Sequence, residues 1–188
     1  MKKYLLIVMM AVSSHLIMSQ DYFKKIPQVP DKYTAATVTI RMIDGLGYRY
    51  YWATEGLTDD NMGYQVSKEA RTLRQTMEHL MGLSVMIRST VSGEAFNRNF
   101  NANLMTHQQL REETLKNLES ARKALQSNTK LSKLEIQYGQ DATLPFWNAI
   151  NGPIEDAVWH TGQVVMMRRG AGNPLPKGVN VLLGETKQ

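Results

Sequence analysis

The chain has 188 residues, a length that fits one domain with a hydrophobic core of its own. Its residues are 43% hydrophobic and 21% charged, close to the globular average, which excludes a disordered or fibrous protein. The formal net charge is only +5, and Lys and Arg are spread among Asp and Glu and form no block, so the charge gives no indication of nucleic-acid binding. The absence of cysteine excludes disulfides, thiolate metal sites and a cysteine nucleophile.

Residues 1–19 have the pattern of a signal peptide. Lys2 and Lys3 form the positively charged start, an apolar run follows, and Ser19 is a small residue at a plausible cleavage point. The apolar run is about 15 residues long and contains polar residues, whereas a membrane-spanning helix needs roughly 20. We therefore expect an exported protein, periplasmic or secreted, with residues 20–188 as a single domain and no stable membrane insertion after cleavage.

Apolar residues recur at helical spacing in successive parts of the chain. We expect long helices over about 34–56, 68–91, 106–127 and 153–169. The second has the clearest repeat, and its expected buried seam consists of Leu73, Met77, Leu80, Ser84, Ile87 and Val91. Four amphipathic helices in one short chain predict an all-α fold, a four-helix bundle.

Local signals set the expected helix boundaries. Ser67 is the expected N-cap of the second helix, and Thr106 with Gln109 forms a capping box at the start of the third. Gly45 and Gly47 lie inside the first helix, where each costs about 1 kcal/mol relative to alanine. Their presence predicts a close approach by a neighbour or a local bend.

The segments between the helices are shorter and more polar. We expect a connecting turn at 58–64 and a short extended piece at 133–138. The bulky aromatic residues are expected to pack the core rather than bind a cofactor, and they are Tyr48, Tyr50, Tyr51, Trp52, Trp147 and Trp159.

Three of the four histidines follow the signal segment. His107 lies in a polar run, and we expect it on the surface. His160 comes four residues after Asp156, so both side chains project from one helical face and can share one ion. The same spacing also fits an ordinary helix pair. His79 borders the apolar seam of the second helix, and the pattern alone favours a purely structural role for a histidine at such a position over metal binding.

Other catalytic motifs are absent: the sequence has no P-loop, no Gly-x-Gly-x-x-Gly, no serine elbow and no His-Glu-x-x-His. Glu78 and Glu155 each precede a candidate ligand. A sequence neighbour on a helix points about 100° away, so neither is automatically a general base. Trp159 and Arg168 are candidates for the rim of a pocket on the last helix.

Two segments resemble the DinB-like (damage-inducible) superfamily of four-helix bundles. They are residues 76–83 (Thr-Met-Glu-His-Leu-Met-Gly-Leu) and residues 151–164 (Asn-Gly-Pro-Ile-Glu-Asp-Ala-Val-Trp-His-Thr-Gly-Gln-Val). The resemblance covers most of the chain after the signal segment and includes residues 45–55 and 168–174. The chain looks most like an exported branch of that superfamily.

The resemblance implies a metal site. Members place one histidine on the second helix and a His-x-x-x-His pair on the last long helix, and these three bind a divalent metal. His79 and His160 match the first and third of these, whereas Asp156 stands where the pair's first histidine is expected. Two histidines and one carboxylate favour harder ions, so the implied cofactor is a divalent ion such as Zn, Ni, Fe or Mn.

The resemblance also implies a class of function. Relatives are hydrolase-like or transfer small thiol cofactors to electrophiles, and such cofactors are mainly cytosolic. For an exported chain we therefore expect hydrolase-like chemistry with metal-activated water on a small molecule. Two alternatives stay open: a protein that binds a small ligand or metal without turnover, and a structural domain, monomeric or homodimeric. No basic stripe or recognition motif supports a nucleic-acid partner, despite the family name.

Overall fold

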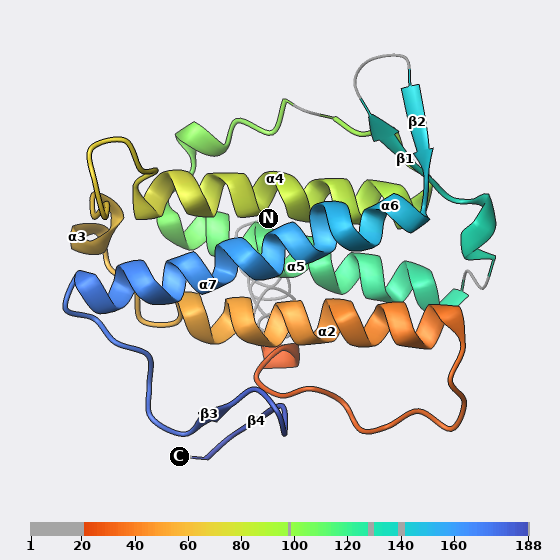
Figure 1. The fold of residues 1–188 in the computed structure, drawn as a ribbon, viewed down its shortest axis with the longest axis horizontal. Coiled ribbons are helices and arrows are strands. Elements are labelled where there is room, and N and C mark those ends of the chain that lie inside the picture. The colour runs from red at the N-terminus through yellow and green to blue at the C-terminus, as the bar shows by residue number, and fades with distance from the viewer. Residues whose placement is uncertain (1–20, 98, 128–129, 139–141, 188) are drawn as a thin grey trace, which may run out of the picture.

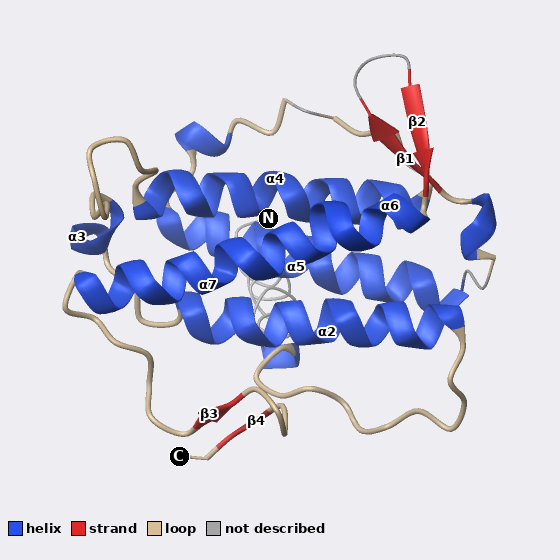
Figure 2. Cartoon of the chain, in the orientation of Figure 1, coloured by secondary structure: helices blue, strands red, loops and turns tan. Residues whose placement is uncertain are grey.

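The structure is a computed structural model, and it describes residues 21–97, 99–127, 130–138 and 142–187. The expected signal peptide, residues 1–19, lies outside the described residues. The described chain is mostly helical, in agreement with the expected all-α class (Figures 1 and 2). Its long helices are α2 (Ala35–Thr54), α4 (Leu73–Ser92), α5 (His107–Ser127) and α7 (Glu155–Gly170).

Shorter elements connect the long helices. The helix α3 (Asp59–Met62) and the 3-10 turns Ala102–Leu104 and Leu131–Lys133 lie in the connections, and α6 (Trp147–Ala149) continues through a π turn (Ile150–Ile154) into α7. Two antiparallel hairpins complete the described chain, β1 (Glu135–Tyr138) with β2 (Ala142–Pro145), and β3 (Val179–Asn180) with β4 (Glu185–Thr186).

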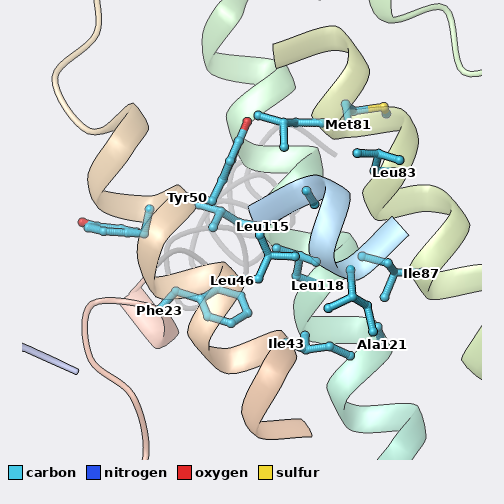
Figure 3. Close-up of a cluster of buried hydrophobic side chains, with 14 of the residues drawn as sticks. Phe23, Ile43, Leu46, Tyr50, Met81, Leu83, Ile87, Leu115, Leu118 and Ala121 are labelled. Carbon is cyan, nitrogen blue, oxygen red and sulfur yellow. The ribbon is translucent and has the colours of Figure 1, made fainter. Parts of the chain in front are cut away.

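The long helices share one hydrophobic core. Helices α5 and α7 each pack against both α2 and α4, and Figure 1 shows α7 lying between α2 and α4. Every residue of the seam expected on the second helix is buried. Figure 3 shows side chains from α2, α4 and α5 meeting in this core, among them Ile43, Leu46, Ile87, Leu115 and Leu118. Burying one such side chain contributes about 1.5–3 kcal/mol.

The expected start of the second helix was wrong. Helix α4 begins at Leu73, because Thr72 and Gln75 form a reciprocal capping box there. The Thr72 amide donates to Gln75 Oε1 over 2.9 Å, and the Gln75 amide donates to Thr72 Oγ1 over 3.2 Å. Ser67 belongs instead to a turn, in which the Ala70 amide donates to its carbonyl over 3.2 Å.

Other element boundaries agree with the expected ones, and the structure adds detail to some of them. Thr106 and Gln109 form the expected capping contacts at the start of α5. The extended piece expected at 133–138 is realised as strand β1. The connecting turn at 58–64 contains α3, because the Thr58 amide donates to Asn61 Oδ1 and closes one helical turn. Pro153, the expected first residue of the last helix, lies in the π turn just before α7.

Two of the expected core aromatics are exposed. Tyr48, Tyr50, Tyr51 and Trp52 are buried as expected, but Trp147 is 76% and Trp159 is 72% exposed. The buried stripe of α7 runs along Ala157, Thr161, Val164, Met167 and Arg168. Trp159 lies two residues from Ala157 and therefore points away from that stripe.

Arg168 does not line the rim of a pocket, as the sequence suggested, but is 1% exposed in the core. Its Nη1 donates to the carbonyls of Trp52 and Ala53, each over 3.0 Å, at the end of α2. Its Nε and Nη2 donate to the carbonyl and side-chain oxygen of Asn173. Arg168 thus satisfies carbonyls that a helix C-terminus leaves without partners, and it joins α7 to α2.

The C-terminal hairpin, which the sequence did not predict, is hydrogen-bonded to α2 and to the segment before it. The Tyr48 hydroxyl donates to the Glu185 carbonyl over 2.8 Å, and the Ile26 amide donates to the Gly184 carbonyl over 2.8 Å. None of the helices in the described part of the chain combines the length and the apolar character that a membrane span requires.

Gly47 confirms the close approach expected inside the first helix. A Cβ atom at Gly47 would lie 2.2 Å from ring atoms of Phe23, which is fully buried. The space is much too small for a methyl group, so the absence of a side chain at Gly47 lets the N-terminal segment pack against α2.

We expect Gly47→Ala to lower the free energy of unfolding by about 1–2 kcal/mol, because the overpacking cost exceeds the helix-propensity gain. Gly162→Ala is the matched control: its Cβ would meet nothing within 4 Å, so propensity alone should raise stability. Urea denaturation of both variants measures the two changes. Equal stabilisation by both substitutions would contradict the packing of Phe23 against Gly47.

Candidate metal centre

Helices α4 and α7 bring three potential metal ligands together. His79 lies on the second turn of α4, and Asp156 and His160 lie on the first two turns of α7. One ligand atom from each residue lies within 4.8 Å of the other two. The two helices pack side by side (Figure 1), which places residues far apart in sequence at one point. The structure therefore assembles the residues that the sequence predicted as ligands.

Asp156 contacts both imidazole rings. Its Oδ2 is 3.2 Å from His79 Nε2, and its Oδ1 is 3.4 Å from His160 Nε2. The two rings are perpendicular, with centroids 4.5 Å apart. Donor atoms about 2.0–2.2 Å from a tetrahedral ion lie roughly 3.3–3.6 Å apart, and one ligand atom from each of the three residues lies within 4.8 Å of the other two, so a small approach of the side chains would let them share one ion.

The environment favours neutral imidazole at His79. Burial lowers the pKa of His79, and the charges of His160 and Arg71 lower it further, against the opposing effect of the Asp156 hydrogen bond. A neutral ring keeps a lone pair for a metal. The side chains of His79 and Asp156 are 31% and 36% exposed, so an ion and a small molecule can reach them from solvent.

Gln163 orients His160 from behind. Its Oε1 lies 2.8 Å from His160 Nδ1. An amide oxygen only accepts hydrogen bonds, so Nδ1 is the donor in this contact, and Nε2 is the ring nitrogen that faces Asp156. This is the supporting contact that metal-ligating histidines typically have. The sequence prediction missed Gln163, although its position three residues after His160 on the same helix was visible.

His107 is not on the surface, as expected, but is 8% exposed. Its Nδ1 lies 2.8 Å from Asp59 Oδ1, and its Nε2 lies 3.1 Å from the Leu57 carbonyl. The acceptors belong to Asp59, the first residue of α3, and to Leu57 just before it, and the polar sequence around His107 did not reveal that this segment lies against the start of α5. Both ring nitrogens are used by the protein, so His107 holds α3 to α5 and has no free donor atom for an ion.

Neither glutamate next to a candidate ligand borders the centre, in agreement with helical geometry. Glu78 Oε1 pairs with Arg74 Nε over 2.9 Å. Glu155 lines a separate hollow together with Val158 and Leu182. The chemistry of the centre therefore rests on His79, Asp156 and His160 themselves.

A pocket adjoins the centre. It has a volume of about 380 Å³, and His160 and Gln163 form part of its wall. Comparison of the chain with known families finds no matching family model, and comparison with curated proteins finds no match. The geometry of the centre and of this pocket is therefore the basis for inferring function.

We expect Gln163→Leu to weaken metal binding by about 10–100-fold, because the His160 ring loses the contact that fixes its orientation. Gln108→Leu, on the exposed face of α5, makes the same chemical change away from the centre and should leave affinity unchanged. Competition with a metal-chelating dye measures both constants. Equal affinity in the two variants would exclude an orienting role for Gln163.

Proposed function

We propose that this chain is an exported, divalent-metal-dependent enzyme of the DinB-like superfamily with hydrolase-like chemistry, and that its long helices form the four-helix bundle of that superfamily. The observation that carries the proposal is the meeting of His79, Asp156 and His160, with His79 and Asp156 separated by 77 positions in the sequence. These are the residues on which the resemblance depends, and they lie on the second and last long helices.

The donor set fits a divalent ion. Two neutral imidazoles and one carboxylate suit Zn, Ni, Fe or Mn, and three protein ligands leave coordination positions for water and a substrate. A divalent ion held there would supply Lewis acidity and a water molecule of lowered pKa. The chain's own residues have distinct roles: His79, Asp156 and His160 hold the ion, and Gln163 keeps the His160 ring in place.

The candidate centre has buried residues on one side and is exposed to solvent on the other. Thr76, one turn before His79, is fully buried, and its hydroxyl contacts the sulfur of the buried Met167. The centre opens instead toward the partly exposed side chains of His79 and Asp156. Solvent and a small molecule can therefore reach the centre, and the buried Thr76 and Met167 lower the local dielectric constant on its inner side, which strengthens electrostatic interactions there.

A second candidate function is a protein that binds a metal or small ligand without turnover. The observation that favours it is the placement of Glu78 and Glu155, which are directed away from the centre. An enzyme with this centre depends on its ligands and on a water molecule for proton transfer. Stoichiometric metal binding without turnover of any ester, amide or phosphoester would favour this second function.

We expect the protein purified without chelators or a histidine tag to hold about one equivalent of one divalent metal by mass spectrometry. Asp156→Ala and His160→Ala should lose it, because two ligands hold an ion much less tightly than three. Asp59→Ala removes a carboxylate from the other aspartate–histidine pair and should keep the metal. Metal-free native protein, or ligand variants that keep full occupancy, would refute the centre.

We expect metal affinity to fall as the pH decreases, because protons compete for the imidazole nitrogens. The pKa of His79 is lowered, so its part of this loss should occur below the ordinary histidine value of about 6.5. Titration of the apo protein with metal between pH 5 and pH 8 measures the profile. An affinity that does not change over this range would show that the imidazoles are not ligands.

A further inference from the structure

The pocket beside the candidate centre is formed by two parts of the chain. The loop before α4 contributes Val66 and Arg71, and α7 contributes His160, Gln163 and Met166. His160 thus belongs both to the candidate metal ligands and to the pocket wall. A molecule held in the pocket lies against the centre, and a volume of about 380 Å³ suits a small ligand.

The loop that forms one wall is held in place by defined contacts. The Leu73 amide donates to the Tyr64 carbonyl over 2.8 Å and closes the loop at its base. The Gln65 side chain donates to the Ser67 carbonyl over 2.7 Å. Tyr64 also packs on Gly170 at the end of α7, where a Cβ atom would lie 2.1 Å from the Tyr64 hydroxyl oxygen. The wall is therefore fixed against α7.

The pocket combines apolar walls with one cation. Val66 is 56% and Met166 is 63% exposed, and these two apolar side chains lie on different walls of the same pocket. Methionine adapts its shape to apolar ligands. Among the residues that line this pocket, Arg71 is the one Arg, Lys, Asp or Glu. Within the described ranges Arg71 forms no ion pair, in contrast to Arg74, which pairs with Glu78.

The charge of Arg71 reaches the centre as well as the pocket. It contributes to the lowered pKa of His79, which lies two helical turns further along the chain. A guanidinium without an internal acidic partner binds carboxylates and phosphates through paired hydrogen bonds. Apolar walls next to it bind an alkyl or aryl group.

We propose that this pocket binds a small organic anion whose carboxylate or phosphate pairs with Arg71 and whose apolar group lies between Val66 and Met166. Where the chain acts as the enzyme proposed above, this anion is the substrate class, and its reactive bond lies beside His160. The binding itself depends only on the pocket and is independent of the bound metal.

Hexanoate and hexyl phosphate are suitable probes, because they share an apolar tail and differ in the anionic group. We expect both to bind metal-free native protein by titration calorimetry, at least tenfold more tightly than acetate or hexylamine. The tighter of the two identifies the preferred anionic group. Equal binding of hexylamine and the anions would overturn the proposal, because an apolar pocket alone does not select charge.

Variants test the assignment to Arg71. Arg71→Gln should weaken hexanoate binding about tenfold or more, since a charged hydrogen-bonded pair is lost. Arg169→Gln makes the same change at an exposed arginine outside the pocket lining and should leave binding unchanged. Met166→Ser should weaken hexanoate binding but not acetate binding. Arg71 and Met166 are both exposed, so neither substitution threatens folding.

The outcomes separate this proposal from the proposed function. If the purified protein contains no metal and hexanoate binding nevertheless depends on Arg71, the result would support the pocket and refute the enzyme. One equivalent of metal together with hexanoate binding that is unchanged in Arg71→Gln would support the centre and overturn the pocket.

Discussion

The packing of α7 against α4 is the interaction on which the candidate centre depends. The stripe of α7 that begins at Ala157 and Thr161 faces the core, and small side chains at these positions let the helix approach its neighbours closely. Burial of this stripe fixes the rotation of α7 about its own axis. Asp156 and His160 each precede a stripe residue by one position, so they lie at the edge of the contact, where His79 of α4 meets them.

Polar groups in the described chain are of two kinds. Some are buried and hydrogen-bonded within the fold, and others are partly exposed and can contact an ion or a ligand. Arg168 and His107 are nearly fully buried, and their nitrogens are taken up by carbonyl and carboxylate oxygens. Burial without such partners would cost each group several times the value of one hydrogen bond. The three residues of the centre differ, because they are partly exposed and their donor atoms face one another. The two aspartate–histidine clusters differ accordingly. Asp59 pairs with a single histidine, His107, whereas Asp156 contacts the rings of two histidines.

The centre and the pocket together define a functional surface along one side of α7. Gln163 belongs to both, since it supports His160 and lines the pocket. The loop between α3 and α4 completes the surface by placing Arg71 next to the centre. In the function that we propose, Arg71 would orient a small anion and the three candidate ligands would hold an ion. These roles would be complementary, because positioning a reactive bond next to a Lewis acid accounts for much of catalysis in metal-dependent hydrolases.

The sequence by itself determined the helical class and most helix positions, because the apolar seam of α4 and the capping box of Thr106 and Gln109 are local patterns. It also indicated His79, Asp156 and His160, through helical spacing and the resemblance to a known family. Only the tertiary structure decided the exposure of Trp147 and Trp159, and the burial of His107 and Arg168. These depend on which other segment packs against each residue, and local periodicity carries no information about that. The pocket with Arg71 also could not be predicted from local sequence patterns. Its two walls come from segments about 90 positions apart, which come into contact only after folding.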